Sequence, residues 1–433
     1  MLGAFANAFR TPDLRRKLLF VLGIVVLFRL GSQVPAPGVH TANVQTCIAN
    51  VEDSSVYTLI NLFSGGALLQ LTIFALGIMP YITASIILQL LVVVIPRLEA
   101  LKKEGQAGQS KITQYTRYLT LGLAVLQATG IVALARSGQL LQGCELPLLH
   151  DEGVSTFLIM VLVMTSGTAV IMWFGELITE RGVGNGMSIM IFCQVVATFP
   201  SSLWQVQQSQ GWWTFGIVMT IGLAIVAAVT FIEQAQRRIP VQYARRMVGR
   251  KMFGGSSTYI PLKVNQAGII PVIFASSLLY LPAMAVQFNQ AANPQPVWVR
   301  FLSRYFVDGG HPLYMAVYFG LIIFFTYFYV SITFNPQEVA DNMKKYGGFI
   351  PGIRAGKPTE DYLSYVLSRI TLPGALYLGL ISLVPLVAFA LINANQNFPF
   401  GGTSILIMVG VALDTVKQIE SQLQQRNYEG FLK

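Results

Sequence analysis

The chain has 433 residues, of which 54% are hydrophobic and only 11% are charged, and its formal net charge is +10. A soluble fold of this length cannot place so much apolar surface in a core, whereas helices that are apolar all round belong in lipid. Three cysteines exclude a disulfide-rich scaffold, and three histidines leave little room for a metal centre.

Stretches of about 17 to 25 mostly apolar residues recur along the chain, which is the length needed to cross ~30 Å of hydrocarbon. The first is preceded by Arg15-Arg16-Lys17 and followed by Pro35-Ala36-Pro37 without a small-residue cleavage site, so we expect a span and not a cleavable signal. We expect ten spans, at 17–35, 73–95, 114–136, 154–176, 186–204, 213–233, 266–288, 313–333, 367–392 and 400–418.

Between the first two spans, residues 56–72 form an apolar segment that is too short to cross and is broken at Gly65-Gly66. Such a segment is re-entrant or interfacial, because non-helical backbone at membrane depth needs protein or water around it. A stopper for a channel and an interfacial helix without a gating role both remain open.

Two pairs of apolar residues recur at helical spacing, Ile78 with Ile82 in the second span and Met187 with Ile191 in the fifth. Residues four apart share a helix face, so each pair can point at a common axis. Ordinary packing or lipid-facing positions explain the same spacing.

Small and polar residues interrupt three of the spans. Small residues let helices approach closely, and amides or hydroxyls between helices contribute roughly 0.6 to 2 kcal/mol each. Interactions of this strength suit a boundary between helices that is stable at rest and can still open. Ordinary packing of a helix bundle has the same composition. The polar candidates are Ser85, Gln89, Gln127, Thr129, Asn265 and Gln266.

The basic residues lie almost entirely in alternate connections and in both terminal segments, and the opposite face carries only Arg136, Arg300 and Arg304. By the positive-inside rule, both termini and the large basic loops are cytoplasmic. Residues 234–265 predict a basic β-hairpin closed by Gly254-Gly255, and residues 334–366 predict a short helix followed by a Gly/Pro-rich tip. Two such basic fingers suit an acidic partner or RNA phosphates, and solvated connectors are the alternative.

Several kinds of site are missing from the sequence. The central spans are nearly free of ionisable residues, no HExxH pair or Ser/His/Asp set occurs, and no nucleotide-binding motif is complete. We therefore expect no enzyme activity, no metal and no cofactor, and an energy source in a partner. From the residues alone, a polypeptide channel, a solute transporter and an intramembrane enzyme remain possible. Cys193 reads as an inert core residue, and the pairing of the outer Cys47 with Cys144 is left open.

Specific strings resemble the SecY family, the central subunits of the bacterial protein-conducting channel, from about residue 12 to the C-terminus. They include FRLGSQVPAPGV (28–39), NLFSGGAL (61–68), FALGIMPYITASIILQLL (74–91), MWFGELITERGVGNGMSI (172–189), STYIPLKVNQAGIIPVIFASS (257–277) and FNPQEVADNMKKYGGFIPGIR (334–354).

The resemblance implies an all-α membrane fold of ten spans. Two inverted, pseudo-symmetric five-helix halves, residues 1–205 and 206–433, enclose a central pore with a short re-entrant plug helix at about 57–72. The residues implied for the pore ring are Ile78, Ile82, Met187, Ile191, Ile273 and Ile407, and those for the plug are Asn61, Phe63, Ser64, Gly65, Gly66 and Leu68. The polar seam residues match the family's lateral gate, which releases signal sequences and transmembrane segments into lipid.

The resemblance also implies the partners. The basic loops would dock the motor ATPase SecA or the translating ribosome through Arg237, Arg238, Arg250, Lys251, Lys263 and Arg354. Further partners are the small membrane subunits SecE and SecG, the membrane insertase and accessory translocon proteins, secretory preproteins and membrane lipids. The implied location is the bacterial plasma (inner) membrane.

Overall fold

The computed structural model describes residues 11–51, 66–138, 146–151, 153–243, 246–248, 251–253, 257–289, 296–307, 311–392 and 402–430. Every one of the ten predicted spans coincides with a helical segment in this part of the chain. These helices are α2 (Pro12–Gly31), α5 (Met79–Val94), α7 (Gln106–Arg136), α8 (Val154–Arg181), α9 (Gly186–Gln234), α10 (Ile270–Asn289), α12 (Pro312–Thr333), α14 (Lys357–Ile392) and α15 (Gly402–Gly430).

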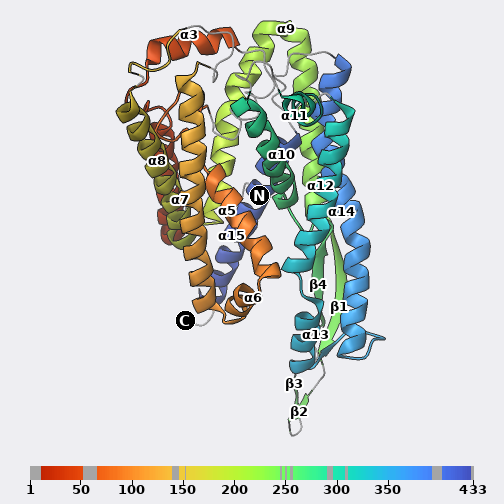
Figure 1. Cartoon of the computed structure of the whole chain (residues 1–433). Helices are drawn as coiled ribbons and strands as arrows, with labels where there is room; N and C mark the ends of the chain where they lie inside the picture. The colour runs from red at the N-terminus through yellow and green to blue at the C-terminus, as the bar shows by residue number, and fades with distance from the viewer. Residues whose placement is uncertain are drawn as a thin grey trace.

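Five of the described helices are by themselves long and apolar enough to cross a membrane, and a bent pair makes a sixth. Two shorter apolar helices lie at 186–200 and 270–279. The short elements gather at opposite ends of the bundle (Figure 1): α3 (Thr41–Val51) and α11 (Val297–Leu302, continued by the π-helix Ser303–Val307) at one end, α6 (Pro96–Lys103) and α13 (Pro336–Lys345) at the other.

The second predicted span was placed too early. Residues 66–78 form turns, and α5 begins only at Met79, because Gly77 adopts a φ of 56° and Pro80 stands at the helix start. The helix ends at Val94, where Ile95 is extended before Pro96, and the chain then bends by 99° into α6.

The fifth and sixth spans form one helix, α9, interrupted at a single residue. Gly211 has φ 80° and ψ 176°, outside the helical region, and the chain turns there before it runs back. Only glycine adopts this conformation readily, so the reversal needs no loop.

The predicted basic hairpin is confirmed, with a different turn. Strands β1 (Gln236–Tyr243) and β4 (Ser257–Lys263) pair antiparallel, and β5 (Gly348–Phe349) adds to the edge of β1. Strands β2 (Arg246–Val248) and β3 (Lys251–Phe253) form the tip, and Val248 pairs with Lys251, so the chain reverses between these two residues. Gly254 and Gly255 follow β3 and lie outside the described residues.

The two basic loops, expected as separate fingers, share one apolar core. Ile239 and Val241 of β1 and Leu262 of β4 are buried against Met343 of α13 and Leu363 of α14. The predicted helix within QEVADNMKKY is α13, and Asn335 caps it by accepting hydrogen bonds from the backbone N–H of Gln337 and Glu338. We call this joined structure the docking unit, after the role that the sequence analysis expects of its two loops.

Candidate functional site

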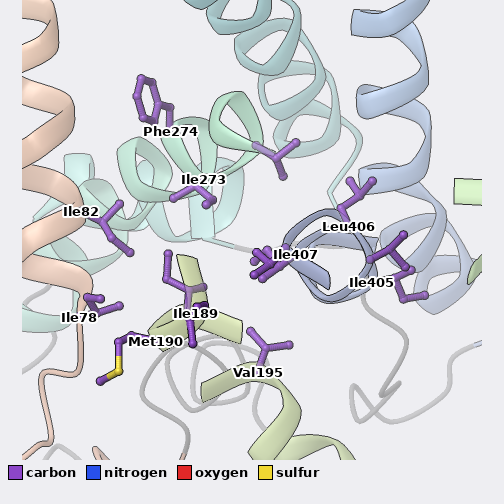
Figure 2. Close-up of a cluster of buried hydrophobic side chains, with 14 of the residues drawn as sticks. Ile78, Ile82, Ile189, Met190, Val195, Ile273, Phe274, Ile405, Leu406 and Ile407 are labelled. Atoms are coloured by element: carbon purple, nitrogen blue, oxygen red, sulfur yellow. The ribbon is translucent and has the colours of Figure 1, made fainter. Parts of the chain in front are cut away.

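Five of the six predicted ring residues lie in one buried apolar cluster, although they come from distant parts of the chain. Ile78 stands just before α5, Ile82 on α5, Ile191 on α9, Ile273 on α10 and Ile407 on α15, and each is at most 8% exposed. Figure 2 shows Ile82, Ile273 and Ile407 pointing toward one another from three different helices. Apolar side chains from four helices thus meet in the middle of the bundle.

The start of α5 stacks two of these residues. The backbone N–H of Ile82 donates to the carbonyl of Ile78 over 3.1 Å, so the second isoleucine stands one turn above the first. The turn at Gly77 that delays the helix therefore also sets the height of Ile78 in the bundle.

The start of α9 is fixed by its cap and by a close helix contact. Asn185 accepts from the backbone N–H of Met187 at 3.1 Å, and Thr179 Oγ1 accepts from Gly186 N at 2.9 Å. Gly186 lies directly against the backbone carbonyl of Gly175 on α8, where a Cβ would not fit. This contact fixes the direction in which Ile191 leaves the helix.

Met187 differs from the other ring candidates. It is only partly buried, and its sulfur lies 2.6 Å from the position that a Cβ on Gly175 would occupy. Its side chain therefore packs against α8. Ile189 and Met190, which sequence reasoning missed, are buried in the cluster from the same helix (Figure 2). A run of consecutive apolar residues gave no signal to choose between them.

The polar seam candidates are only partly brought together. α5 packs extensively on α7 and only slightly on α8 and α10. Gln89 Nε2 lies 3.5 Å from Ser85 Oγ on α5, Thr129 bonds the carbonyl of Val125 on its own helix, and Gln127 is buried on α7.

Asn265 and Gln266 lie in the turn before α10 and bond within their own half. Asn265 Nδ2 donates to Glu233 Oε1 at 2.6 Å and to the Gly268 carbonyl at 3.1 Å, while Gln266 Oε1 accepts from Lys263 N at 3.2 Å. These hydrogen bonds do not cross to α5 or α7. These two residues fasten the base of the hairpin and the start of α10.

The plug candidates are mostly outside the described residues, namely Asn61, Phe63, Ser64 and Gly65. Gly66 has a φ of 90°, which agrees with the predicted break, and Leu68 is 5% exposed. Residues 71–73 pair with the end of the first span: Ala36 N donates to Leu71 O at 2.9 Å and Ile73 N to Val34 O at 3.0 Å.

Among the docking candidates, Arg237, Arg238 and Arg354 are exposed on the docking unit. The Arg238 guanidinium lies 4.8 Å from the centre of the Tyr259 ring, and the Arg354 carbonyl accepts from Thr359 Oγ1. Lys263 instead forms an ion pair with Asp414 of α15 at 3.3 Å. Lys251 begins β3, and Arg250 lies outside the described residues.

In the part of the chain that the structure describes, no three His, Cys, Asp or Glu residues are grouped so as to hold a metal ion. Cys47 is disulfide-bonded and Cys193 is a free thiol. Cys144 lies outside the described residues.

Known proteins resemble this chain over its whole length. Residues 72–416 match the family model described as SecY. The chain is 66% identical over 440 residues to the protein translocase subunit SecY of Streptomyces scabiei and 62% identical over 442 residues to that of Mycobacterium tuberculosis, with full coverage of both partners in each case.

Solved structures share the fold at lower identity. A protein-conducting channel superimposes with a TM-score of 0.62 at 19% identity over 94% of this chain and 91% of the other. The channel of a canine ribosome-channel complex from the endoplasmic reticulum gives 0.60 at 17% identity over the same shares. This chain therefore has the fold of these channel structures, as the sequence led us to expect.

Proposed function

Because this chain belongs to the SecY family of protein translocase subunits, we propose that it forms the pore through which unfolded secretory polypeptides cross the membrane. The observation that carries the proposal is the convergence of Ile78, Ile82, Ile191, Ile273 and Ile407 in one buried apolar cluster. These residues come from both the 1–205 half and the 206–433 half, so a pore between the halves would be lined by both.

An apolar constriction suits this task physically. It hinders ions and water by dewetting, yet it offers a passing polypeptide no strong binding site. We assign Met187 to the edge of this ring, because it packs against Gly175 and only borders the cluster. Residues 57–72 would be the plug of the resting pore.

Release into lipid would occur between α5 and α10. These helices make little contact, and Ser85, Gln89, Gln127 and Thr129 lie on the α5–α7 side of that boundary. A signal sequence or transmembrane segment is apolar enough to prefer lipid once the boundary parts, so partitioning drives the sorting. Asn265 and Gln266 would act at the base of α10 and not across the boundary.

From the charge distribution we infer that the docking unit lies in the cytoplasm and that α3 and α11 lie on the outer face of the bacterial inner membrane. The exposed Arg237, Arg238 and Arg354 suit acidic protein surfaces or ribosomal RNA, so we infer that SecA or the ribosome binds there. SecE and SecG would complete the complex, the insertase and accessory proteins would join it, and the chain would have no enzymatic activity of its own.

Photo-crosslinking with a stalled secretory chain tests the pore directly. Crosslinkers at positions 78, 191 and 273 should capture the stalled chain, whereas a crosslinker at Leu380, which is 59% exposed on the outside of α14, should not. Capture from position 380 alone would contradict a pore at the isoleucine cluster.

A further inference from the structure

Two histidines that lie far apart in the sequence meet at the outer end of the bundle. His40 lies between α2 and α3, and His150 lies just before α8. Their imidazole rings are 4.4 Å apart between centres and tilted by 57°. Neither ring belongs to the constriction, the lateral boundary or the docking unit, so the proposed function does not use them.

The backbone holds the two rings in place. Val39 and Leu149 form an antiparallel bridge, His40 N donates to Leu148 O at 2.9 Å, and His150 N donates to Gly38 O at 2.9 Å. In this register the two histidines are diagonal neighbours on the same side of the bridge, within reach of each other. Gly38 allows the turn with a φ of 88°. The pair is therefore fixed by its backbone before any ligand binds.

The two rings also have free coordinating capacity. His40 Nδ1 is buried and has no hydrogen-bond partner among the described residues, while the His150 side chain is exposed. The neighbouring Asp151 uses Oδ1 to accept from the backbone N–H of Gly153 at 3.1 Å. A buried imidazole nitrogen without a hydrogen bond, next to a second and accessible imidazole, is a chelating arrangement for a metal that prefers nitrogen ligands.

The spacing of the rings selects among such metals. A metal–nitrogen bond is about 2.0–2.1 Å long and a ring nitrogen lies about 1 Å from its ring centre, so a shared ion would sit about 3 Å from each centre. Two centres 4.4 Å apart then subtend close to a right angle at the ion. Right angles belong to the tetragonal and octahedral coordination of Cu²⁺ and Ni²⁺, whereas Zn²⁺ prefers a tetrahedral site.

We propose that His40 and His150 form a bidentate site for a divalent copper or nickel ion, with solvent completing the coordination. Cys47 on the adjoining α3 is disulfide-bonded, which indicates an oxidising compartment at this end and favours cupric over cuprous copper. The ion would join the 38–40 and 148–150 segments. Because residues 34–36 also pair with 71–73, it would fasten three outer segments together.

Electron paramagnetic resonance of the full-length chain in detergent, purified without a polyhistidine tag and titrated with CuCl₂ at neutral pH, tests the site. The wild type should bind one Cu²⁺ per chain with two directly bonded nitrogens. His150→Ala should lower the affinity by more than about tenfold, since even outer-sphere partners of a metal ligand contribute that much. His311→Ala is the matched control, because His311 packs on Tyr305 and caps Leu313 N far along the chain.

Each outcome decides the question. A two-nitrogen signal that survives in His311→Ala and is lost in His150→Ala and His40→Ala supports the site. A wild-type spectrum without two bonded nitrogens, or equal binding in His150→Ala, overturns it. NiCl₂ should also raise the thermal unfolding midpoint of the wild type and of His311→Ala, but not of His150→Ala. Binding occurs in the resting chain, so this result is independent of whether the chain transports polypeptides.

Discussion

Asn265 Nδ2 donates a 2.6 Å hydrogen bond to Glu233 Oε1 and thereby ties the turn before α10 to the last turn of α9. Both residues are less than 9% exposed, and the β1–β4 hairpin lies between them in the chain. The backbone closes the same ring, because Val264 N donates to Ala235 O at 3.0 Å. The start of the proposed gate helix is thus fastened where the docking unit joins the bundle.

We expect Asn265→Ala to destabilise the chain by about 1–3 kcal/mol, because it leaves the buried Glu233 without its amide donor. Glu233→Gln should cost less, since the amide oxygen can still accept from Asn265 Nδ2. Thermal unfolding of both variants in detergent measures the difference. An unchanged midpoint in Asn265→Ala would show that the bond does not support the fold.

A charge in the isoleucine cluster should open the resting pore to ions. Ile407→Lys places an ammonium group among side chains that hinder ions only by being apolar, so wetting of the constriction should follow. Ile407→Leu keeps the volume and the apolar character and should remain tight. Single-channel conductance in planar bilayers distinguishes the two, and equal conductance would count against the ring assignment.

Two glycines at the α8–α9 contact should respond differently to alanine. In Gly175→Ala the new methyl group meets the flexible end of Met187, so shortening that side chain in Gly175→Ala/Met187→Ala should restore stability. In Gly186→Ala the methyl group meets the backbone carbonyl of Gly175, which cannot move aside, and Met187→Ala should not help. Unfolding midpoints of the four variants test this contrast. Rescue of both glycine variants would mean that the helices separate easily.

Reversing a charge on the docking unit should block motor-driven transport. Arg354→Glu replaces an exposed cation in the turn between β5 and α14 by an anion, which repels an acidic partner surface without touching the packed core. Arg136→Glu, exposed at the end of α7 and on the opposite face by our topology, is the matched control. Preprotein uptake into membrane vesicles with SecA and ATP should stop in the first variant and continue in the second. Normal uptake in Arg354→Glu would exclude docking at this residue.

The sequence predicted what depends on local composition. Apolar length placed all ten spans, and the charge pattern predicted both basic loops, because each signal lies within one stretch of chain. It placed the start of the second span wrongly, since hydropathy does not register the turn that Gly77 and Pro80 impose. That the isoleucines of four helices meet in one cluster was predicted only from the family resemblance, because Ile78 and Ile407 are more than 300 residues apart in the sequence.

Contacts between loops that lie far apart in the chain could not be predicted from the sequence. Ile239 and Met343 share one core, yet periodicity within either loop indicated only that each has a buried side. For the same reason, three histidines in separate loops indicated no metal site, although the fold brings two of their rings together.

The shared core of the docking unit packs the hairpin firmly against α13 and α14, so the hairpin is not a loosely attached loop. A force applied at β2 and β3 would be transmitted to α13 and α14 through the buried contacts of Ile239, Val241 and Leu262. The Lys263–Asp414 pair offers a second route to α15, the helix that carries Ile407. Both partners of that pair are substantially exposed, so it contributes at most about 1 kcal/mol. It would therefore break before the buried contacts of the shared core do. A force on the hairpin would therefore move α14 through buried contacts, whereas its effect on α15 would depend on the weak Lys263–Asp414 ion pair.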